Sequence, residues 1–389
     1  MDITNLTTYS LFALSVVLCV YILWFYKQTF AYWRKRGLIY LEPTIPFGNA
    51  YDVCLKKHTF GELFAQFYLK LKERGVKHGG AYIFWKPVYI PVDSEIIRNI
   101  LIRDSEYFPN HGMYINEKND PLSGHIFNME NVEWRNFRSK MPSVFTSAKM
   151  RKMFLIMEGM TKRFNSNLNA YAKSGHAVDI KKETTKFTTD IIAACAFGIE
   201  SNTMKNENEE MLKQARGFFD YQWNYIRNTL VMTLPRPFLK KINFRIMPKG
   251  LERYFRDLCE KIINHRKESH LDRGDLADTL MRLMQKRETD FTGKDTMEPL
   301  NFEQFMAQAC VFFSAGFETS SSTQTFAMYE LAKDLDCQVK LRKEIDKVLE
   351  KYDNKVTYEA VMEMKYLDCV VDGKHSITLI FREAEVHFG

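Results

Sequence analysis

The sequence predicts a mainly helical fold with one small β-sheet (α+β), preceded by a transmembrane helix. Three observations support this prediction: a long uncharged segment opens the chain, apolar residues recur at helical spacing through most of the remainder, and residues 81–92 alternate as a β-hairpin does. With 389 residues, 46% of them hydrophobic and 14% aromatic, the chain is long enough to bury a large core.

The N-terminal segment has the features of an uncleaved membrane anchor. No charged residue occurs from Ile3 to Tyr26. At ~1.5 Å per residue, this stretch and its flanks can cross a hydrocarbon layer of roughly 30 Å. Basic residues follow at Lys27 and at residues 34–36, so the positive-inside rule predicts a cytoplasmic body. The alternative, a signal peptide, would need a basic start and a small-residue cleavage site, and neither is present.

The charge balance and the cysteines argue against two classes of protein. The net charge is +7, from 55 basic and 48 acidic residues, without the concentrated basic motif of a nucleic-acid-binding protein. Clusters such as Lys240–Lys241 are typical of solvated helix faces, with a docking patch for an acidic partner as the alternative. Seven scattered cysteines without a C-x-x-C pair argue against a disulfide framework or a zinc site, and we expect reduced, mostly buried thiols.

Beyond a stiff linker at residues 43–49, rich in Pro and Gly, most of the chain reads as helix. The stretches that predict helices share apolar residues at three- and four-residue steps, and they are Met150–Phe164, Thr184–Phe197, Leu251–Ile263, Leu276–Met284 and Leu335–Leu349. The second of them ends at Gly198, a residue suited to a left-handed C-cap. The alternating residues 81–92, interrupted by Lys86-Pro87, are the only sheet that we expect.

The most informative segment is a predicted helix from Asn301 to Asp334. Asn301 and Gln304 can cap its start reciprocally, and the fourteen residues from Gln304 to Phe317 carry no charge, as in a buried helix. A glycine, a carboxylate and hydroxyls follow in its middle, at residues 315–321. Each is costly inside an apolar helix, up to ~1 kcal/mol for the glycine. The combination indicates a function, or else a local kink with back-bonding hydroxyls.

The segment Ala315-Gly316-Phe317-Glu318-Thr319 resembles the oxygen-binding helix motif of cytochromes P450, small-Gly-x-acid-Thr. By this resemblance, Ala315 and Gly316 belong to the cofactor site and leave room for dioxygen above a haem. Glu318 and Thr319 are, by the same resemblance, the catalytic residues that help to deliver protons.

A second motif agrees with the first. Trp134 and Arg138 form a W-x-x-x-R pair on one helical face, which resembles the pair that holds a haem propionate in the same family. The resemblance implies an incomplete cytochrome P450 fold in three parts: an anchor with its basic flank at residues 1–36, a partial cytochrome P450 domain at 37–372, and a tail at 373–389 unrelated to the family.

Within that family, this sequence is most similar to the insect microsomal branch that handles xenobiotics. This resemblance implies a haem-dependent monooxygenase in the endoplasmic reticulum membrane, with a cytoplasmic body. The enzyme would oxidise small apolar substrates with O₂ and with electrons from NADPH, delivered by NADPH–cytochrome P450 reductase. No nucleic-acid partner is expected.

By the same resemblance, three aromatic or Met-containing segments would contact substrate, and core packing is the alternative for each of their residues. They are the loop Phe108–Phe127 with Met113 and Tyr114, the set Phe218, Phe219 and Trp223, and the set Phe312, Phe313 and Phe317.

The family's C-terminal motifs, an E-x-x-R pair and the loop with the iron-binding cysteine, have no counterpart in these residues. Cys369 lacks the loop's context, and His375 and His387 are the remaining conceivable iron ligands. We therefore expect no protein metal ligand, weak or absent haem binding, a tendency to aggregate, and no activity of this chain by itself. The alternatives to an enzyme are a non-catalytic truncated isoform or a gene-model fragment, still anchored, and an unrelated anchored helical protein.

Overall fold

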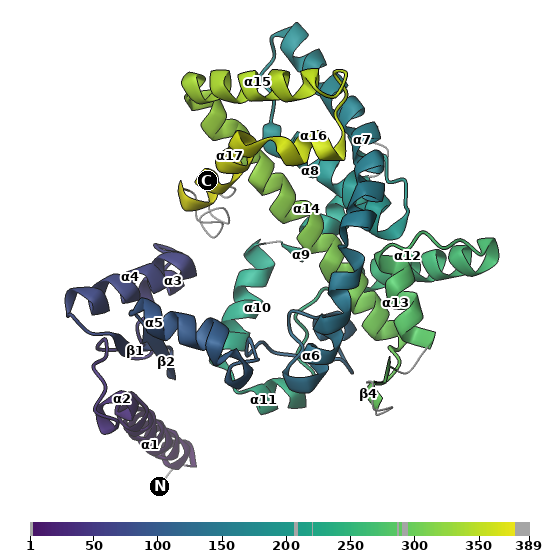
Figure 1. Cartoon of the computed structure of the whole chain (residues 1–389). Helices are drawn as coiled ribbons and strands as arrows, with labels where there is room; N and C mark the ends of the chain where they lie inside the picture. Colours follow the sequence, from purple (N-terminus) through teal and green to yellow (C-terminus); the bar gives the residue numbers. More distant parts are fainter. Residues whose placement is uncertain (1–2, 206–208, 220, 286–287, 290–294, 378–389) are drawn as a thin grey trace. The chain divides into compact units, whose positions relative to one another are not determined.

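The computed structural model describes residues 3–205, 209–219, 221–285, 288–289 and 295–377. These residues form two compact units (Figure 1). One comprises the chain up to Pro109 together with Thr229–Pro235, and the other comprises Asn110–Asn228 and the described residues from Arg236 onward. The mainly helical prediction is confirmed, and each unit is described separately below.

The first unit begins with α1 (Ile3–Phe30) and α2 (Tyr32–Lys35). Within the described residues, α1 is the one helix that is long and apolar enough to cross a membrane, over Tyr9–Phe30. Its side chains from position 9 to position 25 are exposed, as a lipid-facing surface would be.

The hairpin of the first unit consists of β1 (His78–Ile83) and β2 (Lys86–Pro91), paired antiparallel. The prediction of a hairpin is confirmed, although its first strand begins three residues earlier than the alternation suggested. Lys86 and Pro87, which the alternation placed between the strands, belong to β2. The end of α1 lies against it, because the Tyr82 hydroxyl donates to the Phe30 carbonyl over 2.9 Å. The linker is docked here too: the Asn49 amide oxygen accepts the backbone N–H of Tyr82 over 2.8 Å.

Short helices cover this hairpin and complete the first unit. They are α3 (Tyr51–Cys54), α4 (Phe60–Glu73), α5 (Ser94–Arg98), η1 (Asn99–Arg103) and η2 (Ser105–Tyr107). A small core joins them to the strands, and it includes Leu63, Phe67 and Leu71 of α4 with Ala81 and Ile90 of the hairpin.

The second unit is a helical body. In chain order, its elements before the central helix are η3 (Pro121–Gly124), α6 (Asn131–Lys140), η4 (Met141–Val144), α7 (Ser147–Ser174), α8 (Ile180–Ile192), η5 (Ala193–Phe197), η6 (Thr203–Lys205), α9 (Glu209–Phe218), α11 (Arg236–Lys241), α12 (Lys249–Ser269) and α13 (Leu276–Gln285). Helix α10 (Tyr221–Thr233) spans the boundary between the units. The last elements are α14 (Phe302–Lys333), α15 (Leu335–Glu350), α16 (Tyr358–Glu363) and α17 (Lys365–Ile377).

A second sheet, of β3 (Glu288–Thr289) and β4 (Asp295–Met297), corrects the expectation of a single one. Strands of two and three residues are too short to show an alternating pattern, so the sequence carried no signal for them.

Helix α14 is the long central helix of this unit, and its predicted start is confirmed. The Asn301 amide oxygen accepts the Gln304 backbone N–H over 2.8 Å, and the Gln304 side chain accepts the Asn301 N–H over 3.1 Å. Phe305, Phe313 and Phe317 are fully buried in the main core. The uncharged stretch of α14 is therefore core-facing, as its composition predicted.

The helix predicted at residues 335–349 is confirmed as α15, and its apolar residues differ in burial. Leu341 and Val348 are buried, Ile345 and Leu349 are partly buried against a small core, and Leu335 and Val339 are exposed. One expectation about burial needs correction. All seven cysteines are free, yet only Cys195, Cys259 and Cys310 are buried. The expectation of mostly buried thiols was therefore too broad.

Candidate functional site

The predicted motif on α14 presents one exposed face. Ala315 and Thr319 lie four residues apart and are both exposed, and the Thr319 hydroxyl donates to the Ala315 carbonyl over 2.6 Å. One turn earlier, the partly buried Phe312 ring stacks on Phe145, with centroids 6.5 Å apart and planes at 30°. We call Phe145, Phe312, Ala315 and Thr319 the open face of α14. It combines the apolar surface of the first three residues with the hydroxyl of Thr319.

Gly316 lies on another side of α14, against α8. A Cβ atom at Gly316 would lie 2.6 Å from Cδ1 and 2.7 Å from Cγ1 of Ile192, which is closer than real Cβ contacts come. The glycine therefore allows α8 and α14 to approach closely. This packing is reason enough for a glycine here, independent of any ligand.

We expect Gly316→Ala to destabilise the second unit by about 1–3 kcal/mol, because the added methyl group must displace Ile192 in a packed seam. Gly159→Ala is the matched control, since Gly159 lies in the middle of α7 with nothing within 4 Å of its Cβ position. That change should stabilise the protein by up to ~1 kcal/mol through helix propensity. Urea unfolding in detergent measures both, and equal effects would contradict the packing role of Gly316.

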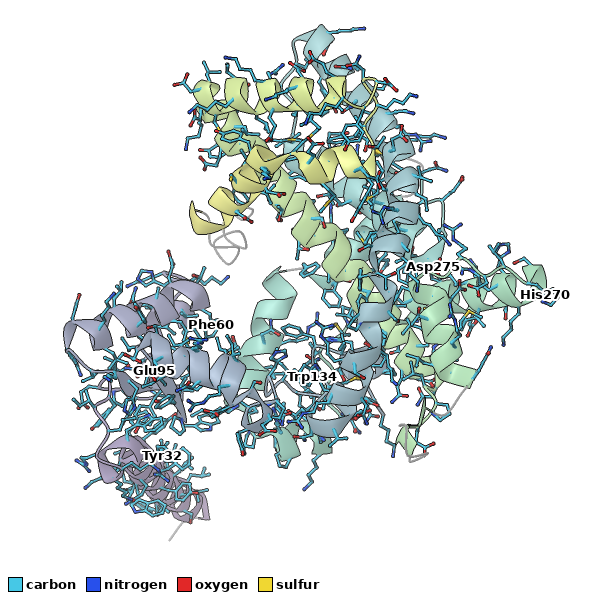
Figure 2. The ribbon with its side chains drawn as sticks, in the orientation of Figure 1. Tyr32, Phe60, Glu95, Trp134, His270 and Asp275 are labelled. Carbon is cyan, nitrogen blue, oxygen red and sulfur yellow. The ribbon has the colours of Figure 1, made fainter. Side chains whose placement is uncertain are left out.

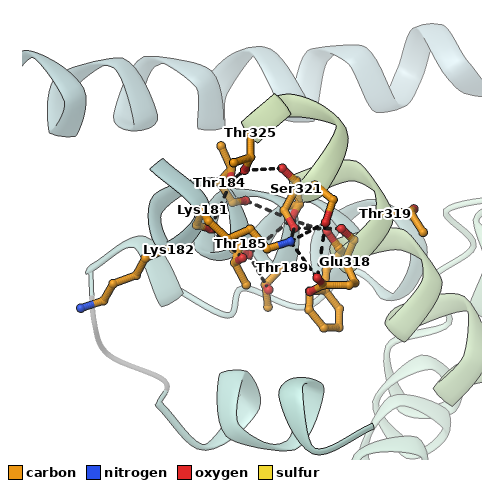
Figure 3. A network of polar contacts seen from close by, with 12 residues as sticks. Lys181, Lys182, Thr184, Thr185, Thr189, Glu318, Thr319, Ser321 and Thr325 are labelled. Carbon is orange, nitrogen blue, oxygen red and sulfur yellow. Dashed lines mark hydrogen bonds and ion pairs between the residues drawn. The ribbon is translucent and has the colours of Figure 1, made fainter. Parts of the chain in front are cut away.

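Glu318 points toward α8, away from Thr319 (Figure 3). Its carboxylate Oε1 lies 2.7 Å from the Lys181 ammonium, and the side chains are 27% and 16% exposed. The same ammonium donates to the hydroxyls of Ser321 over 3.1 Å and of Ser322 over 2.5 Å. The two predicted catalytic residues are therefore adjacent in sequence but lie on different sides of the helix.

We call the contact between α8 and α14, with Lys181 and Ile192 on one side and Gly316 and Glu318 on the other, the seam. Hydroxyl groups of α8 also lie in it. Thr188 Oγ1 donates to the Phe317 carbonyl over 2.8 Å, and the hydroxyls of Thr184 and Thr325 are 3.0 Å apart. Sequence reasoning missed Lys181, Thr184 and Thr188. The available signal was the density of polar residues at 181–189, in the first part of α8, ahead of the apolar residues at its end.

Trp134 and Arg138 both lie on α6, as their spacing predicted (Figure 2 labels Trp134). Trp134 is partly buried and packs against the main core. Arg138 is exposed, and among the described residues its guanidinium has no hydrogen-bond or ion-pair partner. An anchored indole beside an unpaired guanidinium is a suitable pair of donors for a carboxylate group.

The predicted substrate-contacting residues divide between core and surface. Phe313 and Phe317 are buried, and their rings lie 5.8 Å apart within the core. Tyr114 is also buried, with its hydroxyl donating to the Phe244 carbonyl over 3.2 Å. For these three residues the structure shows core packing, which was the alternative to substrate contact. Several others are exposed or partly buried, namely Phe108, Met113, Phe127, Phe218, Phe219 and Phe312. The side chain of Trp223 lies outside the described residues.

A mainly apolar cavity among the described residues does not coincide with the open face. It has a volume of about 330 Å³ and is lined by residues such as Phe137, Leu300 and Gln304. From Gln304 to Ala315, eleven residues advance along α14 by ~16 Å. This cavity and the open face are therefore separate regions of α14.

Three of the five cysteines of the second unit, Cys195, Cys259 and Cys310, are buried. Burial raises the pKa of Cys195 to about 11, and it raises the pKa values of Cys259 and Cys310 further. These three thiols therefore stay protonated at neutral pH, whereas a cysteine binds a metal as the thiolate. The described residues contain no cluster of three metal-ligating side chains. The side chain of His375, and His387 as a whole, lie outside the described residues.

Comparisons with known proteins find the family that the two motifs resemble. The family model named Cytochrome P450 matches residues 43–372. Cytochrome P450 6a8 of Drosophila melanogaster is 34% identical over 366 residues, which cover 94% of this chain and 72% of that protein. Cytochrome P450 6A1 of Musca domestica is 31% identical over 369 residues, which cover 94% of this chain and 70% of that protein.

Proposed function

Because the chain belongs to the cytochrome P450 family and is of the insect type represented by cytochrome P450 6a8, we propose that it is the front portion of a microsomal, haem-dependent monooxygenase that oxidises small apolar substrates. The observation that carries the proposal is the open face of α14. There, apolar surface and the Thr319 hydroxyl occur together at the residues of the family motif.

In our proposal, each motif residue of α6 and α14 has its own role. Trp134 and Arg138 hold the haem through its propionates, because indole and guanidinium N–H groups donate to carboxylates. Ala315, with its small side chain, leaves space next to α14, and Phe312 excludes water with its apolar ring. The Thr319 hydroxyl holds a proton at Oγ1 on the open face. The Glu318 carboxylate, which lies on the α8 side beside Lys181, exchanges that proton only after turning toward the open face. When bound, haem supplies the oxygen-activating chemistry of the family.

We further propose that α1 and the basic residues after it anchor the chain in the endoplasmic reticulum membrane, with the body in the cytoplasm. The apolar, exposed surface of α1 supports this, and so do Lys27 and the basic residues 34–36 on one side of it. NADPH–cytochrome P450 reductase is the proposed electron donor. The family match to residue 372 supports a division into residues 1–36, 37–372 and 373–389.

The three buried thiols of the second unit, at Cys195, Cys259 and Cys310, have raised pKa values that disfavour the thiolate form. We propose that these 389 residues alone bind haem weakly, through the propionates, and do not turn over substrate. The second candidate function is a non-catalytic, membrane-anchored form. It is favoured by the same observation, the raised pKa values of the three buried thiols.

Haemin titration of the purified chain in detergent tests the proposal. We expect saturable binding, seen as a Soret shift, and no thiolate-type band in the reduced carbon-monoxide spectrum. Arg138→Ala should weaken binding by about tenfold, because one charge-assisted hydrogen bond is worth ~1.5–3 kcal/mol. Arg135→Ala on the same helix is the control and should bind as the unchanged chain does. Unsaturable binding, or equal effects of the two variants, would argue against the proposed haem site.

A further inference from the structure

Lys181 is the most completely bonded cation of the seam between α8 and α14. An ammonium has three N–H donors. Each of them has an acceptor here, namely Oε1 of Glu318 at 2.7 Å, Oγ of Ser321 at 3.1 Å and Oγ of Ser322 at 2.5 Å (Figure 3). All three acceptors belong to α14, so a single α8 side chain binds one stretch of the central helix.

The geometry of α14 explains why these three acceptors converge. Residues three and four apart lie on one side of a helix, so Glu318, Ser321 and Ser322 face the same way. Adjacent residues are ~100° apart, since a turn takes ~3.6 residues. Thr319 accordingly shares its side with Ala315 and not with Glu318. The Ser322 hydroxyl also lies 3.4 Å from Glu318 Oε1, which further fixes the carboxylate.

The position of Lys181 in α8 is electrostatically unfavourable by itself. The N-terminus of a helix carries partial positive charge, so acidic side chains are preferred in the first turn. Lys181 nevertheless occupies the first turn of α8, next to the exposed Lys182. The contact with Glu318 compensates for this placement, whereas Lys182 points away from the seam (Figure 3).

We propose that Lys181 is a positioning residue, which holds the Glu318 carboxylate on the α8 side of α14 and thereby determines whether that carboxylate can face the open side with Thr319. The inference rests on the proposed function, since it concerns the division of roles between Glu318 and Thr319. It adds a second role for Glu318, the ion pair with Lys181 that links α8 to α14; we call this ion pair the tie. The partly buried pair is screened less by solvent than an exposed one would be.

A double-mutant cycle with Lys181→Met, Glu318→Gln and the double variant tests the tie. Thermal unfolding of the whole chain in detergent is the measurement, and it requires no haem. Lys181→Met should lower the midpoint by roughly 4–8 °C. The double variant should lower it by no more than the larger single change, because the pair is already broken in each single variant. Lys181→Arg, which keeps the charge, should restore most of the loss.

A spectroscopic readout separates positioning from mere packing. The infrared difference between the unchanged chain and Glu318→Gln isolates the carboxylate band of Glu318. We expect this band to shift in Lys181→Met and to stay unchanged in the control Lys182→Met. Additive effects in the cycle, or an unmoved band, would overturn the inference. Since neither measurement involves haem, their failure is distinguishable from failure of the proposed function, which the haemin titration reports.

Discussion

Replacing Arg266 by methionine is expected to destabilise the second unit by about 3–5 kcal/mol, the cost of breaking a buried ion pair from one side. The Arg266 side chain is 3% exposed, and its guanidinium lies 2.7 Å from Oδ2 of Asp275 and 2.5 Å from Oδ1 of Asp278. It also donates to the Phe197 carbonyl over 3.0 Å. Without Arg266, the buried carboxylate of Asp278 would lose its counter-charge, and that of Asp275 would keep only the contact with Arg273 at 3.2 Å.

This network supports the site from a distance. Arg266 belongs to α12, the two aspartates lie at the start of α13, and Phe197 ends η5. The Phe197 ring in turn contacts Phe313 of α14, with centroids 6.4 Å apart. Loss of the network should therefore loosen the packing behind the open face as well as lower overall stability.

The free energy of urea unfolding, followed by circular dichroism, measures this effect. Arg282→Met is the control, because Arg282 and Asp272 form an exposed pair with atoms 3.7 Å apart, a type of contact worth ~0–1 kcal/mol. Arg266→Met combined with Asp275→Asn and Asp278→Asn should recover part of the loss, since no unpaired charge then remains buried. A loss as small as that of the control would contradict the role assigned to Arg266.

Acid is expected to destabilise the second unit through His125, by about 3 kcal/mol between pH ~6.5 and ~4. The ring is 5% exposed, and burial lowers the pKa of His125 to about 4. Its Nδ1 has no hydrogen-bond partner among the described residues. The flanking backbone is fixed, because the Gln308 amide accepts the Ile126 N–H over 2.8 Å and donates to the Gly124 carbonyl over 3.1 Å.

Acid lowers the unfolding free energy because the unfolded state binds the proton of His125 more readily than the folded state does. The unfolded chain protonates His125 near pH 6.5, whereas the folded chain resists until about pH 4. The stability that the neutral ring contributes is therefore complete above the unfolded pKa and is lost as the pH falls toward the folded pKa.

Unfolding free energies of the unchanged chain and of His125→Gln, measured from pH 7.5 to pH 4, test this expectation. The variant carries no titrating ring, so its stability should fall by about 3 kcal/mol less over that interval. His111→Gln serves as the control, because His111 is exposed and its removal should leave the acid dependence as it is. Parallel curves for the unchanged chain and His125→Gln would exclude the buried ring as the cause.

Local signals in the sequence determined much of this protein. The capping pair Asn301 and Gln304, the left-handed C-cap at Gly198 and the alternation of the hairpin all depend on residues close together along the chain. The family motifs are local too, and the structure places their residues on α14 and α6. The strands β3 and β4 were not predicted, because two or three residues are too few to show an alternating pattern.

Only the tertiary structure decided what each side of α14 meets. Spacing shows that Glu318 and Thr319 point in different directions, but not that Lys181, 137 residues earlier, lies on one of those sides. It likewise cannot show that Gly316 faces Ile192, or that Phe313 and Phe317 pack inward. Periodicity orients a side chain about its own helix axis, whereas its partner depends on how segments distant in sequence pack together.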